Sequence, residues 1–509
     1  MSATDQTSSL VRVLQAATVS QITTTVVLLL IVRFIVRGIF RVYFHPLSRF
    51  PGPKLSAFTR LPTHRATWKG NMHHYVGKIH REYGDIVRIS PDELSIIDPG
   101  AWKDVQGHPT KNTKGSMPSK HFARYGRPLN GEVGMISARD DSHARQRRIF
   151  NPAFSDRALK QQTPLFTKYI DKLVQKLKEG LEEDPDRKWD MVRMYNYTTF
   201  DVMADLTFGA PLHMLDNGDY DPWVKLIFAS IKMGTRISIL THYPLLFRQF
   251  KRFVPQTVNK KRVQHARFAV DRVTKRLEQG RETEGVDVWD LVLAQEDGKG
   301  LTRGEMDSNA GLFMIAGTET TATLVSGLTY LLLQNPECMK KLLAEIRDSF
   351  ATVEDISMES IAALPYLNAC IKEALRLYPP VPVGLPRLTP PDGSTVCGQY
   401  IPPNTALTMP HLAMYTSPRN FKDPLSFVPG RWMGDERYAD DRREAWQPFS
   451  YGSRDCLGKN MANHEMRLMV AKVLYTFDFE LCPESENWKD QAVFNLWEKH
   501  PLFCKLKLA

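Results

Sequence analysis

The chain has 509 residues, of which 42% are hydrophobic and 24% are charged. This composition excludes a disordered protein and predicts a globular chain with a large core. Lys and Arg number 67 and Asp and Glu 56, a formal net charge of +11. No block of like charges stands out, so we expect no nucleic-acid partner; the basic excess suits a membrane surface or an acidic protein partner. The six cysteines form no C-x-x-C pair, and free thiols fit a reducing compartment.

The N-terminal region predicts a membrane anchor at residues 1–40. Val13 to Val32 form a run of 20 residues without a charge, about 30 Å as a helix and close to one hydrocarbon thickness. A cleaved signal peptide is one alternative, but the residues before this run contain only Asp5 and Arg12 instead of a basic segment. An interfacial amphipathic helix is the other alternative. Basic residues after the run place the rest of the chain in the cytosol by the positive-inside rule; they are Arg33, Arg37 and Arg41.

Residues 41–54 predict a hinge between this anchor and the body, because the stretch from His45 to Pro53 is rich in proline and therefore stiff and extended. Residues 55–509 contain no linker, repeat or low-complexity tract, which predicts one large domain. Alternating residues predict a β-hairpin at 85–89 and 93–97. Long apolar patterns predict that most of the rest is helical, with a minor β part; the main segments are 157–183, 190–208, 258–281, 303–333, 337–350 and 461–477.

One cysteine lies in a loop suited to hold a large planar group. The loop runs from Phe449 to Gly458 with the sequence FSYGSRDCLG. Gly452 and Gly458 let the backbone pass close to a ring, Arg454 can meet an anionic group, and the following helix start is expected to lower the pKa of the Cys456 thiol. The alternative is a buried structural cysteine. The pattern Phe-x-x-Gly-x-Arg-x-Cys-x-Gly resembles the heme-binding loop of the cytochromes P-450, which implies that Cys456 binds the heme iron.

A second pattern lies inside the predicted helix 303–333. Its apolar run turns into glycine and clustered threonines from Gly311 to Thr323, poor helix formers whose hydroxyls bond back to the i−4 carbonyl. A helix opened there leaves room for O2 and water, and the adjacent Glu319 and Thr320 can relay protons. The alternative is a solvated turn. The hexapeptide AGTETT at 316–321 resembles the oxygen-activating helix of the cytochromes P-450, which implies a catalytic role for Glu319 and Thr320.

A third pattern predicts a structural network. Glu373 and Arg376 are three residues apart and share a helix face, although isolated pairs of this kind are mostly exposed and contribute little. The segment FVPGRW at 427–432 resembles the family segment whose arginine completes a Glu-Arg-Arg network. The resemblance implies that Glu373, Arg376 and Arg431 form a partly buried, bidentate cluster that holds the chain before the cysteine loop.

A heme carries two propionates, so cationic donors are expected near its edge. His143 and Arg147 are four residues apart on one helix face and resemble the family's Trp-x-x-x-Arg helix, with His143 at the Trp position. This departure keeps an N–H donor. The alternative for Arg147 is a solvated basic face, and Arg387 and Arg454 are further candidates. The cofactor-binding set implied by the resemblance is His143, Arg147, Arg387, Phe449, Gly452, Arg454 and Gly458.

The resemblance extends from the proline-rich stretch to the C-terminus and implies a cytochrome P-450 fold, mainly α with a minor β part, preceded by a transmembrane helix. It implies a heme b monooxygenase of the endoplasmic reticulum membrane that hydroxylates or epoxidises a hydrophobic small molecule. About fifty residues follow Cys456, too few for a flavin domain, so electrons are expected from NADPH through a cytochrome reductase, with cytochrome b5 as a further partner. A basic face for an acidic reductase is expected at Arg145, Arg148 and Lys459.

Short phrases at 44–47, 143–148 and 205–209 resemble filamentous-fungal members similar to the isotrichodermin C-15 hydroxylase type, which tailors secondary metabolites. Segments expected to contact the substrate are rich in apolar residues, which suits a terpenoid, polyketide or alkaloid; they are 105–135, 212–255, 311–320, 381–385 and 494–497. Two other classes are alternatives: a heme-thiolate isomerase or dehydratase that does not use O2, and a non-catalytic heme-binding sensor. The pair Glu319-Thr320 speaks against the first, because such chemistry needs no proton relay.

Overall fold

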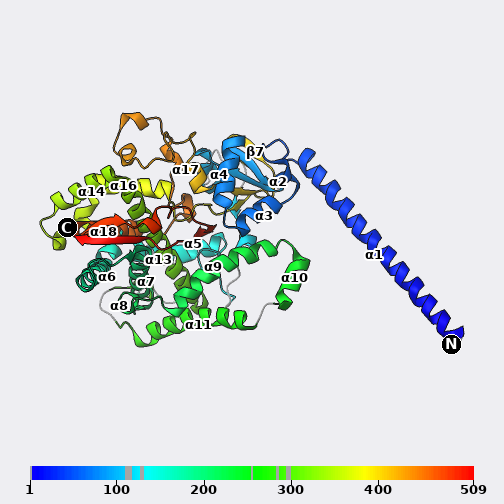
Figure 1. Ribbon diagram of the computed structural model, residues 1–509, viewed down its shortest axis with the longest axis horizontal. Helices are drawn as coiled ribbons and strands as arrows, with labels where there is room; N and C mark the ends of the chain where they lie inside the picture. The colour runs from blue at the N-terminus through cyan, green and yellow to red at the C-terminus, as the bar shows by residue number, and fades with distance from the viewer. Residues whose placement is uncertain (1–2, 109–116, 126–130, 254–255, 283–285, 294–299) are drawn as a thin grey trace.

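A mainly helical body carries one long N-terminal helix, which projects from it as a rod (Figure 1). This computed structural model describes residues 3–108, 117–125, 131–253, 256–282, 286–293 and 300–509. Helices make up 61% of the structure and strands 8%. The expected mainly α class with a minor β part is therefore confirmed.

The secondary-structure elements follow the labels of Figure 1. The α-helices are α1 (Ala3–Tyr43), α2 (Lys54–Phe58), α3 (Leu61–Trp68), α4 (Met72–Tyr83), α5 (Asp140–Phe150), α6 (Asp156–Glu183), α7 (Met191–Phe208), α8 (Met214–Asn217), α9 (Pro222–Leu240), α10 (Pro244–Phe253), α11 (Gln256–Gln279), α12 (Val288–Leu293), α13 (Arg303–Leu333), α14 (Pro336–Ser349), α15 (Met358–Ala362), α16 (Pro365–Leu377), α17 (His411–Tyr415) and α18 (Lys459–Thr476). The strands are β1 (Ile86–Ser90), β2 (Glu93–Ile96), β3 (Ser119–Lys120), β4 (Trp189–Asp190), β5 (Arg387–Leu388), β6 (Ser394–Val396), β7 (Gln399–Ile401), β8 (Ala406–Thr408), β9 (Phe477–Leu481), β10 (Val493–Phe494), β11 (Leu496–Trp497) and β12 (Phe503–Leu508).

The six long helices expected from the apolar patterns are α6, α7, α11, α13, α14 and α18, and their ends lie within two residues of the predicted ones. Local signals explain where two of them begin. The Ser155 side chain accepts a hydrogen bond from the backbone N–H of Ala158 at the start of α6. Thr302 and Glu305 cap each other's backbone N–H groups at the start of α13. Such caps satisfy N–H groups that have no partner inside the helix.

The expected hairpin is confirmed as β1 and β2, which pair antiparallel. It forms one edge of a five-stranded sheet with the order β1-β2-β8-β5-β3, in which β2 and β8 run parallel. The main hydrophobic core lies elsewhere, around α13 and α7. Every residue of α13 from Thr321 to Leu332 is buried, as expected for a helix surrounded by other elements. In contrast, the part of α13 before Thr321 is buried only in part, and this part carries the Glu319-Thr320 pair.

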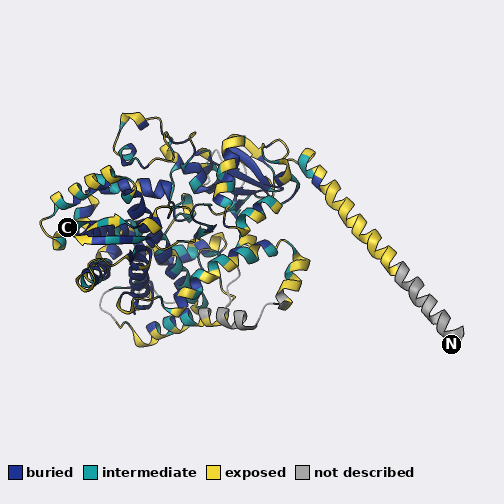
Figure 2. Ribbon diagram, viewed as in Figure 1, coloured by how far each residue is buried: buried dark blue, intermediate teal, exposed yellow. Residues whose placement is uncertain are grey.

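The N-terminal helix α1 is long and apolar enough to cross a membrane. Its apolar window is Val19–Tyr43, with a mean hydropathy of 2.1, and its described side chains are exposed almost throughout (Figure 2). The window overlaps the expected run 13–32 at residues 19–32 and continues through the apolar residues around Arg33 and Arg37. The structure is compatible with the expected membrane anchor.

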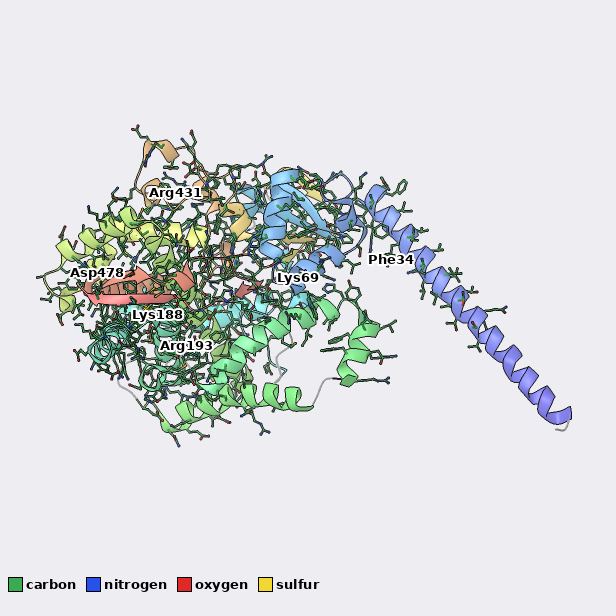
Figure 3. The ribbon with its side chains drawn as sticks, viewed as in Figure 1. Phe34, Lys69, Lys188, Arg193, Arg431 and Asp478 are labelled. Atoms are coloured by element: carbon green, nitrogen blue, oxygen red, sulfur yellow. The ribbon has the colours of Figure 1, made fainter. Side chains whose placement is uncertain are left out.

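The end of α1 is packed against the body. Gly38 faces the ring of Phe58 in α2, and the rings of Phe34 and Phe58 meet edge to face with centroids 5.3 Å apart; Figure 3 labels Phe34 at this junction. The Arg41 carbonyl accepts a hydrogen bond of 2.7 Å from Nη1 of Arg88. The contact between anchor and body therefore begins before the expected hinge.

The proline-rich residues 44–53 also differ from the expected extended hinge. They form a series of turns, and the side chains of Leu47 and Phe50 are buried in the hydrophobic cluster beside the five-stranded sheet. Their backbone is tied down as well, because the Arg88 N–H donates to the Pro51 carbonyl at 2.8 Å. The apolar side chains between the prolines explain the difference, since burying them favours a folded connection over an extended one.

The glycine in this junction allows a direct test. A Cβ at position 38 would lie 2.0 Å from the Phe58 ring, so Gly38→Val is expected to push α1 away from α2. In membranes that contain the protein, trypsin cleavage at Arg49 or Lys54 is then expected to become faster, as read from the fragments over time. Val36→Leu is the control, because Val36 is exposed. Equal cleavage rates in the two variants would contradict this account of the junction.

Candidate functional site

The Cys456 loop is closed by its own backbone. The Cys456 N–H donates to the Phe449 carbonyl at 2.8 Å. Gly452 has φ +78°, and a Cβ there would lie 1.8 Å from the backbone oxygen of Gln106, so this position needs glycine. At Gly458 a Cβ would meet none of the described atoms within 4 Å. The loop is therefore packed tightly on one side and leaves open space where α18 begins.

The surroundings of the Cys456 thiol combine exposure of the residue with desolvation of the thiol. The residue is exposed, yet enough protein surrounds the thiol to change its ionisation. Burial raises the pKa of the thiol and outweighs the Gly458 N–H and the charges of Arg147 and Lys459, which lower it. The helix start was expected to lower the pKa of the thiol. The Gly458 N–H does lower it, but desolvation is larger and leaves the pKa raised.

Arg147 of α5 is bound to this loop. Its guanidinium donates to the Asp455 carbonyl at 2.8 Å and to the Ser453 carbonyl at 3.3 Å, and it pairs with the Asp455 carboxylate at 2.5 Å. Arg147 thus braces the cysteine loop from outside, which a solvated basic face would not do. A contact between Arg147 and a propionate stays a prediction.

Four basic side chains from separate parts of the chain gather beside the loop, and all are largely buried. Lys120, His143 and Arg387 are each 7% exposed, and the Arg454 side chain is 4% exposed. Burial, with the charge of Arg454 second, lowers the pKa of Lys120 to about 7, of Arg387 to about 10 and of His143 to about 4. Three of the four expected propionate donors, His143, Arg387 and Arg454, are therefore brought together, with Lys120 as an additional member.

This cluster has little negative charge of its own. Arg454 pairs with Asp140 at 2.7 Å, but the Asp140 side chain is 72% exposed. Nη1 of Arg454 and the hydroxyl of Tyr125 are buried without a hydrogen-bond partner in the described part of the chain. Because buried charges are normally paired, the cluster fits a ligand with carboxylate groups. Two heme propionates meet this need, and Cys456 lies in the adjacent loop.

No sequence motif marks Lys120, which the sequence interpretation missed. Its ammonium group donates to the Ile136 carbonyl and lies 4.7 Å from the centre of the Tyr125 ring. Gln106 is a second missed residue: its side-chain oxygen accepts from the Ser450 hydroxyl at 2.7 Å and from Arg387 at 3.3 Å. Both residues join the loop to distant segments, and such contacts leave no local pattern.

The helix α13 is not opened at the threonine cluster. It is continuous from Gly311 to Thr323, and the Thr320 hydroxyl donates to the Ala316 carbonyl at 2.6 Å. The expectation of an opened helix is therefore wrong. Hydroxyls that bond back to the i−4 carbonyl satisfy themselves on an intact helix, so the threonines need no break in it.

One face of α13 is nevertheless poorly packed. Leu312, Ile315, Ala316 and Thr320 recur at helical spacing, and none of them is buried, although the same helix is fully buried further on. The neighbouring Glu319 is 3% exposed and pairs with Lys499. The structure thus places Thr320 on the open face of α13 and Glu319 away from it, so the two expected catalytic residues are adjacent in the chain but point in different directions.

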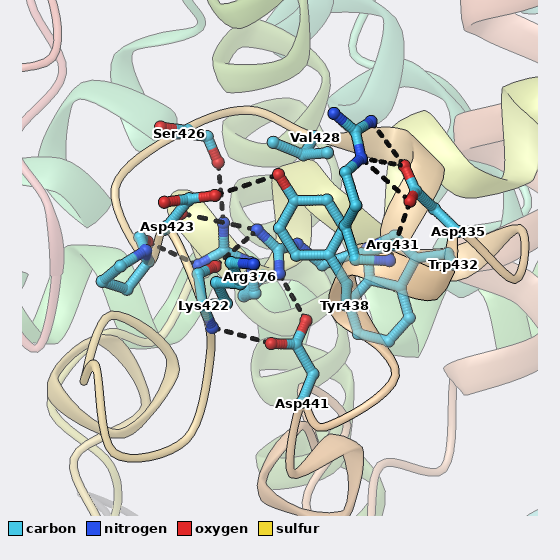
Figure 4. A network of polar contacts seen from close by, with 12 residues as sticks. Arg376, Lys422, Asp423, Ser426, Val428, Arg431, Trp432, Asp435, Tyr438 and Asp441 are labelled. Atoms are coloured by element: carbon cyan, nitrogen blue, oxygen red, sulfur yellow. Dashed lines mark hydrogen bonds and ion pairs between the residues drawn. The ribbon is translucent and has the colours of Figure 1, made fainter.

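The expected structural network is assembled around Glu373, and Figure 4 labels its members Arg376, Arg431 and Asp441. Arg376 binds its carboxylate through two hydrogen bonds of 2.7 and 2.9 Å, and Nε of Arg431 donates to it at 3.1 Å. Asp441, which the sequence interpretation missed, pairs with Arg431. All four side chains are at most 1% exposed, so the cluster is fully buried instead of partly buried.

The network also holds the irregular chain in front of the cysteine loop. Arg376 donates to the carbonyls of Tyr415, Pro424 and Ser426 at 2.9, 2.6 and 2.9 Å. The Val428 N–H donates to Glu373 at 2.9 Å. Residues 416–458 have no long helix or strand, so these bonds replace the ladder hydrogen bonds that this segment lacks.

The expected substrate segments are partly described. Residues 109–116 and 126–130 of the segment 105–135, and residues 254–255 of the segment 212–255, lie outside the described residues. At 494–497, Phe494 and Trp497 are buried, and the Trp497 ring stacks on Tyr378 with centroids 4.5 Å apart. These two side chains therefore contribute to packing of the body.

The network allows a prediction about stability and pH. Burial raises the pKa of Glu373, but the hydrogen bonds and charges of Arg376 and Arg431 outweigh burial and leave the pKa below its usual range. A carboxylate with a lowered native pKa stabilises the fold fully above its unfolded-state pKa, ~4.3, and this contribution is lost as the pH falls through the native pKa. Glu373→Gln leaves the buried Arg376 without a carboxylate and Arg431 with Asp441 alone. This substitution is expected to reduce the free energy of unfolding by about 3–5 kcal/mol at neutral pH.

Urea unfolding at pH 7 and at decreasing pH measures this effect. The control is Lys372→Gln, since Lys372 is the exposed neighbour on the same helix. Equal unfolding midpoints for Glu373→Gln and Lys372→Gln would show that the network does not stabilise the fold.

Comparison with known proteins agrees with this geometry. The family model described as cytochrome P450 matches residues 51–502. The cytochrome P450 monooxygenase efuB of Hormonema carpetanum is 45% identical over 93% of this chain and 94% of that protein. The cytochrome P450 monooxygenase FUM2 of Gibberella moniliformis is 45% identical over 92% of this chain and 99% of that protein. The cytochrome P450 monooxygenase AMT3 of Alternaria alternata is 41% identical over 92% of this chain and 96% of that protein. The resemblance found in the sequence is thereby confirmed, and the chain belongs to the cytochrome P450 family of heme-dependent monooxygenases.

Proposed function

We propose that this monooxygenase hydroxylates or epoxidises a hydrophobic small molecule of fungal secondary metabolism, with electrons from NADPH delivered by a separate cytochrome reductase. The observation that carries the proposal is the Cys456 loop beside a cluster of buried cations that has few carboxylates in the described part of the chain. A metal-binding thiol next to a site for carboxylates fits heme b. The open face of α13 around Ala316 and Thr320 adds a surface at which O2 and a substrate can lie.

This arrangement supports an assignment of individual residues to the cofactor. Cys456 is the ligand of the iron, while Arg454, Arg387 and His143 meet the propionates, with Lys120 as a fourth cation. Phe449, Gly452 and Gly458 shape the loop around the ring, and Arg147 holds the loop in place. Bound heme supplies the activation of O2 in the overall reaction RH + O2 + 2 e− + 2 H+ → ROH + H2O.

The protein must supply the two protons. Thr320 lies on the open face of α13, where its hydroxyl can donate a proton towards the substrate site. Glu319 is the adjacent acid that replaces this proton from solvent. This requirement favours a monooxygenase over the alternative of an isomerase or dehydratase, in which a relay has no purpose.

The electrons come from outside the chain in this proposal. Arg148 and Lys459 are exposed near the cysteine loop and offer positive charge to an acidic reductase, with cytochrome b5 as a second possible donor of electrons. Arg145 contributes less to this face than expected, because it pairs with the buried carboxylate of Glu305. The exposed apolar helix α1 anchors the protein in the endoplasmic reticulum membrane with the body in the cytosol.

The proposed substrate class rests on two observations. The expected substrate segments are rich in apolar residues, and the similar proteins are fungal monooxygenases. A terpenoid, polyketide or alkaloid skeleton fits both. A non-catalytic heme sensor, the remaining alternative, needs neither a reductase nor a relay.

Co-expression with a cytochrome reductase in a host without the gene tests the function. The expected result is a new metabolite that is heavier by one oxygen atom and depends on both the reductase and NADPH. A heme-loaded protein that consumes no NADPH and forms no product with extracts of the source organism would favour the sensor. A product without added oxygen that forms in the absence of O2 would instead favour the isomerase or dehydratase.

A further inference from the structure

Glu319 has a buried partner that no sequence pattern marks. Nζ of Lys499 forms an ion pair with Oε1 of Glu319 and donates a hydrogen bond of 2.7 Å to the Thr323 hydroxyl. Both charged side chains are 4% exposed. The second carboxylate oxygen, Oε2 of Glu319, is buried without a hydrogen-bond partner among the residues that the structure describes.

Such a pair is an inefficient way to stabilise a fold. The cost of removing two charges from water is offset only when their remaining donors and acceptors also form hydrogen bonds. Oε2 of Glu319 forms none among the described residues. Burial lowers the pKa of Lys499, against the opposing effect of the Glu319 charge. A buried ionisable pair next to a reaction site is a candidate for a functional role.

The pair fixes the direction of Glu319. Successive residues on a helix are about 100° apart, so Glu319 and Thr320 project from different sides of α13. The Thr320 hydroxyl is bound to the Ala316 carbonyl on the open face. The Glu319 carboxylate is instead turned towards Lys499 and Thr323, one turn further along the helix. In this arrangement Glu319 cannot hand a proton to Thr320.

Lys499 is itself held by the hairpin of β10 and β11. It follows Trp497, whose ring stacks on Tyr378 and whose Nε1 donates to the Pro379 carbonyl at 2.8 Å. Asn495 in the same hairpin donates to the Thr235 hydroxyl of α9 at 3.2 Å. The position of the ammonium group is therefore set by the packed body and not by a freely moving chain end.

We propose that Lys499 is a positioning residue for proton delivery, which holds the Glu319 carboxylate ready but turned away from Thr320. This inference rests on the proposed roles of Glu319 and Thr320. Glu319 takes up a proton from solvent, leaves Lys499 as a neutral carboxyl, and gives this proton to the Thr320 hydroxyl while Thr320 passes its own proton to the substrate site. The carboxylate that results returns to the Lys499 ammonium, so each cycle moves one proton and leaves both side chains unchanged.

Two substitutions of Lys499 test the proposal in the reductase-coupled holoenzyme. Lys499→Met removes the charge. It is expected to leave the rate of NADPH oxidation unchanged, while the product formed per NADPH falls about tenfold. This loss is smaller than the rate factor of about 10²–10⁴ that a positioned proton donor contributes, because Lys499 acts only through Glu319. Hydrogen peroxide is expected to rise in proportion, with a changed solvent isotope effect on product formation. Lys499→Arg can still pair with Glu319 and is expected to restore most of the coupling, while the KM for the substrate stays unchanged in both variants.

The hairpin offers a matched control. Glu498, one residue away, forms an ion pair with Lys232, and these side chains are 43% and 38% exposed. Glu498→Gln removes this exposed pair and is expected to keep the product per NADPH of the wild type. A fall in Glu498→Gln equal to that in Lys499→Met would assign the effect to the hairpin and overturn the role of Lys499.

The remaining outcomes separate this inference from the function on which it rests. Wild-type coupling in Lys499→Met, together with loss of coupling in Thr320→Ala, would overturn the role of Lys499 and leave the relay. Wild-type coupling in Thr320→Ala would overturn the relay itself. If Lys499→Met binds no heme, the double variant Lys499→Met with Glu319→Gln, which leaves no unpaired buried charge, replaces it. This variant is also expected to lose coupling, and wild-type coupling in it would overturn the proposal.

Discussion

The bonds of Arg376 and Arg431 to one buried carboxylate are the constraint on which the rest of the site depends. The chain between α17 and α18 is irregular, so its backbone groups cannot satisfy one another in a helix or a sheet. The Glu373 carboxylate binds both arginines, and Arg376 donates its remaining N–H groups to backbone carbonyls of this segment. With Asp441 added, two carboxylates balance two guanidinium groups, so the cluster carries no net charge. A neutral, fully buried network of this kind can fix the path of the chain that leads to Cys456.

The buried network around Glu373 and the second buried cluster, beside the Cys456 loop, differ in their charge balance. In the described part of the chain, the second buried cluster, around Arg387 and Arg454, holds several cations, and the carboxylate that pairs with it, Asp140, is exposed. Burial of like charges is unfavourable, and the lowered pKa of Lys120 is a direct sign of it. The network around Glu373 is complete without a ligand, whereas the second cluster becomes balanced when a dianionic group binds. In the proposed function this dianionic group is the pair of propionates of the heme that Cys456 would bind.

The sequence predicts helices and side-chain contacts well where the residues concerned are close together in the chain. The apolar patterns predicted the long helices, and the spacing of Glu373 and Arg376 predicted their contact. Contacts between distant segments were not predicted where no motif marks them: Lys499 pairs with Glu319 from beyond the β10-β11 hairpin, and Asp441 pairs with Arg431. The pKa of Cys456 shows the same limit, because the helix start is visible in the sequence while the surrounding protein that raises the pKa is not. In α13, the clustered threonines suggested an opened helix, but hydroxyls that donate to the i−4 carbonyl also occur on an intact helix.

The spectrum of the reduced protein with carbon monoxide tests the central claim most directly, because a thiolate ligand shifts the heme absorption to the red. The wild type is predicted to show this red-shifted band, and so is Cys338→Ser, which removes another free cysteine. Cys456→Ser is predicted to lose the band, since a serine hydroxyl cannot replace the thiolate. A red-shifted band that persists in Cys456→Ser would contradict the account, because the iron would then be held by a different cysteine.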